Sequence, residues 1–331
     1  MGLMAALYRE LVAAAALLDR HVALRTLVSS DLRVSVLAPG SRTRLPHAEA
    51  FNRCLDRYLG GRHFYLPDLQ RPTLRQLVRD EFRQRANATI GTDGLDTAFV
   101  ALRALSRTLA DAKALNLLPP STPLTPRETW TLDDVQLTAD VASGVFLVAH
   151  PLLEGVFGRS VVVLTEHTLK GSKGYIVNKV SKNPLRRAFR APSRVMQVFG
   201  TSIVRKGGPV FARNAEVLHG RADFGGERVT TTNFPTASDP SLFVGVDLDV
   251  AAKAVGDGTA KQTDVVFMSG MSAWSPGQLN AEVKQGSWVP VKAPVSLALN
   301  APAELWLDIM RTIGGEYAEM SCVPSMEEEA E

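Results

Sequence analysis

Residues 145–149 have the sequence Val-Phe-Leu-Val-Ala, and this stretch decides how the second half of the chain folds. Valine and phenylalanine favour extended backbone, and a short unbroken apolar run is typical of a strand in a sheet core. A second run of this kind, residues 160–165 (SVVVLT), follows after ten residues. The two runs predict a sheet.

Further elements extend outward from these two runs. Residues 171–174 (GSKG) predict a turn that leads into a strand at 175–178. We expect two more strands at 242–246 and 265–268, and two helices at 276–284 and 302–313. Ser275 precedes the first of these helices as an N-cap, and Gln278 closes its capping box. The region is therefore predicted to be an α/β sheet domain.

Several ordered blocks of this region resemble the AlgH/YqgE family of bacterial proteins. The blocks are GVFLVAHP (144–151), VVVLTEH (161–167), GYIVN (174–178), GGPV (207–210), LH (218–219), GMSAWSPGQL (270–279) and Trp288. The resemblance implies an AlgH-like fold, and the family has no agreed chemistry. The residues it singles out, as structural positions or as a pocket, are His150, Pro151, Asn178, Gly207, Gly208, Pro209, His219, Trp274, Gly277 and Gln278.

No catalytic motif is readable in this region. His150, Glu166, His167 and His219 lie on separate blocks without the spacing of a metal site. No serine lies in a GxSxG elbow, and residues 171–174 lack the form of a phosphate-binding loop. We therefore expect no enzyme activity, no catalytic residue and no bound metal, although an enzyme or small-molecule-binding role for the AlgH-like domain stays open.

The first hundred residues carry helical patterns instead. Leu7, Leu11, Ala14 and Leu18 recur on one face of a first helix. Thr73 and Gln76 form a capping box that starts a second helix. A third helix is expected from about residue 93, with an apolar face at 95, 99, 102 and 109, and a short extra helix at 47–58.

Arginine dominates the charge of this helical region. Residues 1–120 hold 17 Lys+Arg, of which sixteen are Arg, against 11 Asp+Glu, so their balance is +6 within a chain of net charge +3. In the second helix Arg75, Arg79 and Arg83 form a ridge beside the apolar ridge of Leu74, Val78 and Phe82. Such a ridge predicts an acidic protein partner or RNA.

The tripeptide Leu7-Tyr8-Arg9, together with this arginine-rich helix and Phe82, resembles the LYR-motif (complex 1 LYR-like) family of mitochondrial three-helix proteins. The resemblance implies that Arg9, Arg75, Arg79 and Arg83 bind a mitochondrial acyl carrier protein. It also implies that Leu7, Tyr8 and Phe82 line a channel for the acyl chain. In this interpretation the chain binds no cofactor directly, and the carrier protein supplies the acyl-phosphopantetheine.

These patterns predict an α+β multidomain chain, with an LYR-type three-helix bundle followed by an AlgH-like α/β sheet domain. The expected boundaries are 1–118 for the helical domain, with an insertion at about 21–72, then a Pro-rich linker at 119–130, the sheet domain at 131–325 and an acidic tail at 326–331.

The two resemblances together imply a non-enzymatic scaffold or assembly factor in the mitochondrial matrix. Mitochondrial ribosome biogenesis is the leading prediction, with other subunits of a large mitochondrial assembly, and ribosomal RNA, as further partners. An accessory subunit or assembly factor of a respiratory-chain complex is the alternative. Two cysteines without a CxxC pair fit a reducing compartment, and no apolar run is long enough to span a membrane.

Overall fold

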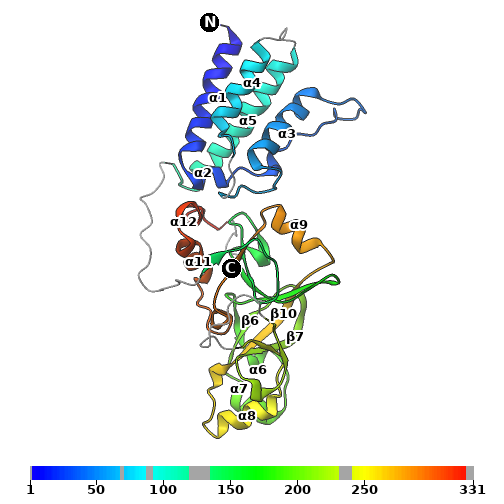
Figure 1. Cartoon of the computed structure of the whole chain (residues 1–331), viewed down its shortest axis with the longest axis vertical. Coiled ribbons are helices and arrows are strands. Elements are labelled where there is room, and N and C mark those ends of the chain that lie inside the picture. The colour runs from blue at the N-terminus through cyan, green and yellow to red at the C-terminus, as the bar shows by residue number, and fades with distance from the viewer. Residues whose placement is uncertain (1, 68–70, 87–91, 119–134, 231–240, 326–331) are drawn as a thin grey trace. The chain divides into compact units, whose positions relative to one another are not determined.

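The computed structural model describes residues 2–67, 71–86, 92–118, 135–230 and 241–325 (Figure 1). The predicted linker (119–130) and acidic tail (326–331) lie outside the described residues. The chain divides into two compact units. The helical unit comprises residues 1–125, 285–287 and 314–325, and the sheet unit comprises 126–284, 288–313 and 326–331. Among the described residues, no helix combines the length and apolar character needed to cross a membrane.

Helices make up the helical unit. They are α1 (Leu3–Arg20), α2 (Val22–Thr26), the 3-10 helix η1 (Ser30–Leu32), α3 (Pro46–Leu59), α4 (Leu74–Ala86), α5 (Thr92–Ala114) and α12 (Gly315–Met320). The long helices α1, α4 and α5 run alongside one another, and α3 packs against α4 and α5 (Figure 1). The short extra helix predicted at 47–58 is confirmed as α3, and α2 is a further helix within the predicted insertion at 21–72.

The buried faces of α1 and α5 explain how closely these helices pack. In α1 the buried residues are Leu7, Leu11, Ala15 and Leu18, so the predicted stripe is confirmed at its three leucines, with Ala15, which was expected to widen it, buried and Ala14 half-buried. In α5 the predicted face was wrong, since Phe99 is 47% exposed. The buried residues of α5 are Ala98, Leu105, Thr108 and Ala112. Small alanines leave room for the neighbouring backbone, which a ridge of Phe and Leu would hold apart.

The sheet unit contains short strands and helices. Its strands are β1 (Gln136–Leu137), β2 (Phe146–Ala149), β3 (Val161–Thr168), β4 (Gly171–Ile176), β5 (Val180–Pro184), β6 (Ile203–Lys206), β7 (Val210–His219), β8 (Glu227–Arg228), β9 (Phe243–Val244), β10 (Val265–Trp274) and β11 (Trp288–Lys292). Its helices are η2 (Gly155–Phe157), α6 (Leu185–Ala188), α7 (Ser193–Phe199), η3 (Ala222–Phe224), α8 (Leu248–Gly256), η4 (Gln262–Asp264), α9 (Gln278–Lys284), α10 (Ser296–Leu299) and α11 (Leu305–Ile313).

Strand β10 organises the sheet. The strand order is β1-β11-β2-β3-β4-β10-β7-β9-β8, with β5 paired to β6 and β6 paired to β10. Every pair among the described strands is antiparallel except β10 with β6. A helical region followed by a largely antiparallel sheet confirms the α+β class. It corrects the α/β description of the sheet domain, because an α/β domain is built on parallel strand pairs, and β10 with β6 is the single parallel pair among the described strands.

A bulge at Gly270 lets β10 pair with different strands along its length. Residues 265–269 pair with β6 and β7, residues 272–274 pair with β4, and the register shifts between Ser269 and Met271. Gly270 has φ +68°, and a Cβ there would lie 2.6 Å from the carbonyl oxygen of Gly208. Only glycine fits this position, since a side chain would require both a strained backbone and a clash.

The turn predicted at residues 171–174 is instead the start of β4. Thr168 pairs with Gly171 and His167 with Ser172, so the chain reverses at Leu169 and Lys170. The glycines serve close packing between strands. A Cβ on Gly174 would lie 2.6 Å from the carbonyl oxygen of Val163. The turn signal in the sequence is therefore a signal of close backbone approach.

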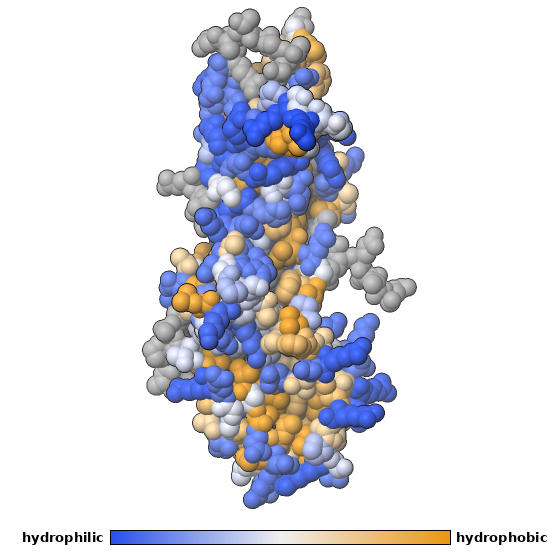
Figure 2. Space-filling model, turned by 90° about the vertical axis from the view of Figure 1, so that its right-hand side faces the viewer, coloured by the Kyte–Doolittle hydropathy of each residue, from blue (hydrophilic) through white to orange (hydrophobic). Residues whose placement is uncertain are grey.

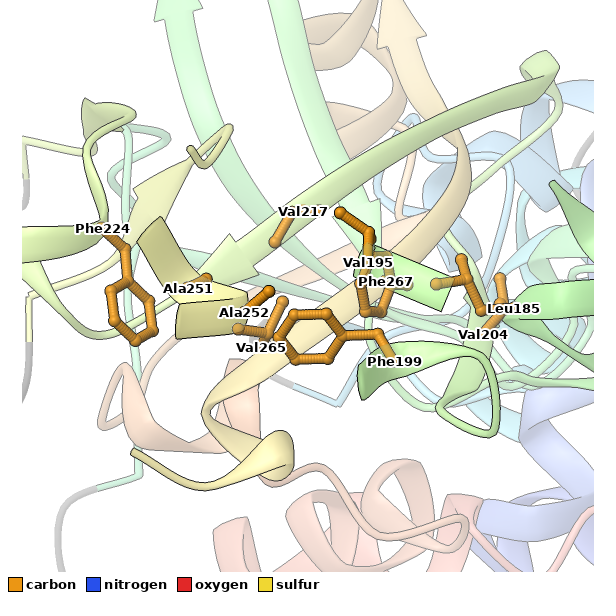
Figure 3. Close-up of a cluster of buried hydrophobic side chains, with 10 residues drawn as sticks. All are labelled: Leu185, Val195, Phe199, Val204, Val217, Phe224, Ala251, Ala252, Val265 and Phe267. Carbon is orange, nitrogen blue, oxygen red and sulfur yellow. The ribbon is translucent and has the colours of Figure 1, made fainter. Parts of the chain in front are cut away.

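A buried cluster fills the space between β10 and the helices α6, α7 and α8. Figure 3 shows its side chains in a row, with Phe199 and Phe267 in the middle and Phe224 at one end. The rings of these two residues lie 5.5 Å apart, edge to face. On the outside, Figure 2 shows hydrophilic side chains projecting between apolar patches.

Candidate ligand-binding site

An apolar cavity of about 90 Å³ lies inside the helical unit. It is lined by Met4, Leu11, Val28, Leu32, Phe51, Cys54, Leu55, Leu74, Leu77, Val78, Glu81, Phe82, Gly94, Thr97, Ala98, Ala101 and Leu105. The lining comes from α1, α3, α4 and α5, together with η1 and the residues before it. The cavity is partly open to the surface, and its apolar walls favour an apolar occupant.

Glu81 supplies the only carboxylate among the lining residues. Its Oε1 lies 3.9 Å from the Nη1 of Arg57 on α3, and the Arg57 side chain is 49% exposed. The site therefore combines apolar walls with one charged pair. This arrangement suits a molecule that has an apolar chain and a polar end.

Tyr8 and Phe82, two of the predicted channel residues, contact each other. Their ring centroids lie 4.9 Å apart at an angle of 54°. Phe82 lines the cavity directly, and Leu7 is buried on the face of α1 that packs inward. The third predicted residue, Tyr8, is half-buried beside Phe82. Sequence reasoning did not identify the contributions of Phe51, Leu55 or Ala98, because their helices meet only in the folded unit.

The four arginines predicted to bind a carrier protein lie along α1 and α4. Arg9, Arg75 and Arg83 are exposed, and Arg79 is half-buried. Arg75 also donates its backbone N–H to Asp19 Oδ2 at 2.9 Å, at the start of α4. The spacing predicted for the ridge on α4 is therefore present. None of these four residues lines the cavity.

His150 and His219, the two histidines of the AlgH-like blocks, are both fully buried. His150 accepts a hydrogen bond at Nδ1 from the backbone N–H of Leu152, at 3.2 Å. His219 donates from Nε2 to the carbonyl of Gly245 at 2.8 Å and accepts at Nδ1 from the N–H of Arg221 at 3.3 Å. Burial lowers the pKa of His219, although those hydrogen bonds partly oppose the shift. Each histidine thus holds local backbone in place.

Asn178 plays a similar role between β3 and β4. Its side-chain oxygen accepts from the N–H of Val161 at 2.8 Å, and its Nδ2 donates to the carbonyl of Arg159 at 2.9 Å. Arg159 has a positive φ of 49°, so these bonds stabilise an unusual backbone conformation. Pro151 is buried directly after His150.

The Gly207-Gly208-Pro209 block connects β6 to β7 against β10. A Cβ on Gly207 would lie 2.3 Å from the carbonyl oxygen of Gly270, and one on Gly208 would lie 2.3 Å from the carbonyl carbon of Met271. Pro209 is exposed. Close backbone contact therefore explains the two glycines.

Trp274 and Gln278 meet at Glu282, a residue that the sequence did not single out. Glu282 Oε2 accepts from the indole N–H of Trp274 at 2.9 Å and from that of Trp288 at 2.8 Å. Its Oε1 accepts from Gln278 Nε2 at 2.9 Å, while Gln278 Oε1 accepts from the N–H of Ser275 at 3.0 Å. The predicted reach of Gln278 back to Ser275 is thus confirmed. The signal for Glu282 was its i, i+4 spacing from Gln278.

Gly277, directly before Gln278 in the chain, lines a hollow of about 370 Å³. His167, Thr168, Leu169, Ser172, Leu279 and Asn280 also line that hollow. His167 Nδ1 and Ser172 Oγ are 2.7 Å apart. The AlgH-like block residues therefore do not converge on one pocket. In the part of the chain that the structure describes, no group of three or more His, Cys, Asp or Glu residues is placed to hold a metal ion.

Comparison with known proteins accounts for the second half of the chain. The sequence profile of a family described as AlgH-like matches residues 146–318. A UPF0301 protein of Chlamydia trachomatis serovar A is 32% identical over 187 residues, which cover 55% of this chain and 91% of the relative. A UPF0301 protein of Chlorobium luteolum is 30% identical over 190 residues, which cover 56% and 93%.

Two solved structures also match this half. The solution structure of the AlgH protein from Pseudomonas aeruginosa is 23% identical, with a TM-score of 0.42, and the match covers 54% of this chain and 92% of that one. A crystal structure of a protein from Corynebacterium diphtheriae is 24% identical, with a TM-score of 0.42, over 55% and 92%.

These relatives overturn the predicted biological role. They are bacterial UPF0301 proteins, and a mitochondrial location or an acyl carrier partner has no support from them. The prediction of a mitochondrial matrix scaffold for ribosome biogenesis was therefore wrong, as was the respiratory-complex alternative. The predicted partners were wrong for the same reason. They were mitochondrial acyl carrier protein, a large mitochondrial assembly and ribosomal RNA. The error came from extending a short motif at Leu7-Tyr8-Arg9 to a whole cellular function.

Proposed function

This chain belongs to the AlgH-like family, and from that premise we propose that it is a non-catalytic binding protein whose helical unit holds a small amphiphilic molecule. The single observation that carries the proposal is the apolar cavity bounded by α1, α3, α4 and α5. Burying an alkyl chain there contributes about 0.8 kcal/mol per methylene. The contacts of His150, His219 and Asn178 with backbone groups support a structural role for these polar residues.

The charge in the cavity selects the polar end of the ligand. The Glu81 carboxylate lines the cavity and can accept a hydrogen bond from a hydroxyl group, whereas it would repel a second carboxylate, a repulsion that the half-exposed Arg57 at 3.9 Å offsets only in part. The ligand class is thus an alkyl chain with a neutral hydroxyl head. The protein requires no directly bound cofactor for this role.

We also propose that the helical unit is an LYR-type bundle. The support is the position of Leu7-Tyr8-Arg9 in the first turns of α1 and the contact of Tyr8 with Phe82 on α4. An experimental structure of the full chain would test both the bundle and that contact.

Calorimetric titration of the full chain with octanol and with octanoate tests the binding proposal. We expect octanol to bind more tightly, and Glu81→Gln to remove that preference. Ala101→Leu fills the cavity and should weaken binding, whereas Ala110→Leu, the same change at an exposed position of α5, should not. Equal binding by both α5 variants would overturn the site. Mass spectrometry of the octanol recovered after the titration tests the non-catalytic role. Chemical conversion of the octanol by the protein would overturn it.

A further inference from the structure

A long stretch of the sheet unit carries positive charge without any acidic residue. Residues 167–215 contain no Asp or Glu. Their cations are Lys170, Lys173, Lys179, Lys182, Arg186, Arg187, Arg190, Arg194, Arg205, Lys206 and Arg213. The formal net charge of the entire chain is only +3, so the positive charge is concentrated in this stretch.

The densest part of this stretch is residues 182–194, which we call the basic segment. It runs from β5 through α6 into the first turn of α7, and Lys182, Arg186, Arg187, Arg190 and Arg194 are all exposed. Within the described ranges, none of these five side chains forms an ion pair or a hydrogen bond.

Some arginines elsewhere in the chain are paired. Arg221 forms an ion pair with Asp223 at 2.7 Å, and Arg25 pairs with Glu316 at 3.1 Å. What distinguishes the basic segment is that five exposed cations without a partner among the described residues lie within thirteen consecutive residues. Like charges this close repel one another, and a bound polyanion would relieve that repulsion.

The fold holds the basic segment with its charges outward. Leu185 and Val195, at either side of the arginines, are 2% and 1% exposed. Figure 3 shows both side chains directed into the cluster around Phe267. Phe189 packs against the same cluster. The apolar residues anchor the segment, so its arginines remain at the surface.

The neighbouring helix does not neutralise this surface. Helix α8 packs against α7 and begins at Asp247 and Asp249. The Asp247 side chain accepts from the backbone N–H groups of Asp249 and Val250, both at 3.1 Å, so it caps its own helix. Asp249 forms no ion pair with any residue that the structure describes.

The composition of the exposed face indicates the kind of partner. Between residues 182 and 194 the exposed residues are Lys182, Asn183, Arg186, Arg187, Ala188, Arg190, Pro192, Ser193 and Arg194. A membrane surface or a protein interface would use large apolar anchors, and residues 182–194 themselves expose none, whereas Val180 and Ile203 are exposed beside them on β5 and β6. Single-stranded nucleic acid would use exposed aromatic rings for stacking, and Phe189 is directed to the core instead.

We propose that the basic segment binds the phosphate backbone of a double-helical nucleic acid, without reading its sequence. Arginine guanidinium groups match phosphate oxygens in a bidentate geometry, and backbone contacts alone give sequence-independent affinity. This role is separate from the cavity of the helical unit.

Fluorescence anisotropy of a short labelled DNA duplex, titrated with the full chain over a series of salt concentrations, tests the proposal. We expect saturable binding that weakens linearly on a log–log plot against salt. The variant R186Q/R187Q/R190Q should reduce the magnitude of that slope by about 3, one for each lost phosphate contact. The control R20Q/R103Q/R107Q removes the same charge from exposed positions of the helical unit and should leave the slope unchanged.

Three results would overturn the proposal. The first is no binding of the duplex by the wild-type chain at low salt. The second is an equal reduction of the salt-dependence slope in both variants, which would mean that binding depends on the net charge of the chain alone. The third is binding of anionic phosphatidylserine vesicles through these arginines without binding of the duplex, which would assign the surface to a membrane. Because the three arginines are exposed and unpaired among the described residues, the thermal unfolding of the variant should match that of the wild type.

Discussion

Asp19, near the end of α1, accepts a hydrogen bond at Oδ1 from the backbone N–H of Leu74 at the start of α4, at 3.0 Å. Its Oδ2 accepts from the N–H of Arg75 at 2.9 Å. Thr73 and Gln76 form the capping box beside it, with bonds of 2.8 and 3.1 Å. The start of α4 is therefore stabilised by the side chain of a helix 55 residues earlier as well as by its own sequence.

Replacing Asp19 should unfold the start of α4. Asp19→Ala leaves two amide groups without their acceptor and should lower the free energy of unfolding by about 1–3 kcal/mol. Urea denaturation measures this loss. Asp96→Ala removes an exposed carboxylate from α5 and serves as the control, with an expected change within about 0.5 kcal/mol. Equal losses in the two variants would contradict the capping role.

Glu282 should be essential for packing of the two tryptophans at α9. Glu282→Ala leaves the indole N–H groups of Trp274 and Trp288 unsatisfied and should cost about 2–4 kcal/mol. Glu282→Gln retains an acceptor oxygen and should recover part of that loss. Denaturation monitored by tryptophan fluorescence distinguishes the two variants. An equal loss of unfolding free energy in both would contradict the role of Glu282 as the hydrogen-bond acceptor of the two indoles.

Comparing alanine substitutions at Gly270 and Gly258 should separate the energetic cost of backbone strain from that of a steric clash. Gly270 and Gly258 have similar φ values of +68° and +74°, but a Cβ on Gly258 meets no atom within 4 Å. Gly258→Ala should therefore cost about 1–2 kcal/mol from backbone strain alone. Gly270→Ala should cost more, by about 1–3 kcal/mol, because backbone atoms of β7 and of Gly208 in the β6–β7 connection would have to move. Chemical denaturation of both variants provides the comparison, and equal costs would contradict the close approach at Gly270.

His219 should make the stability of the sheet unit depend on pH. Burial lowers its pKa in the folded chain from its ordinary value of 6.5, so the unfolded chain binds the proton more readily. This contribution is fully present above pH 6.5 and is lost as the pH falls toward the folded pKa. His219→Gln should flatten that part of the stability profile below pH 6.5, measured by urea denaturation at each pH. An unchanged profile would show that another group titrates.

Local patterns predicted the helices well where the signal lies within a few residues. The start of α4 followed from Thr73 and Gln76, and the buried face of α1 followed from the spacing of Leu7, Leu11 and Leu18. Strands β2 and β3 followed from their apolar runs. These signals are local because capping and periodic burial involve neighbours along the chain.

The same reasoning was wrong where distant segments set the requirement. Phe99 is exposed because α5 presents alanines to its neighbours, and Gly171 and Gly174 lie in a strand because other strands approach them closely. The cavity was anticipated through Phe82 alone, whereas Phe51, Ala98 and Leu105 enter from other helices. Nothing in the sequence around these residues shows which segments will meet.

By itself, the sequence determined that a helical region precedes a sheet domain of AlgH-like character, and where most of the main helices and strands lie. Only the tertiary structure decided that the helices enclose an apolar cavity with Glu81 in its wall, and that the arginines of residues 182–194 face outward without partners. The physical reason is that secondary structure follows from neighbouring residues, whereas cavities and unpaired charge depend on which residues from distant segments come within a few ångströms.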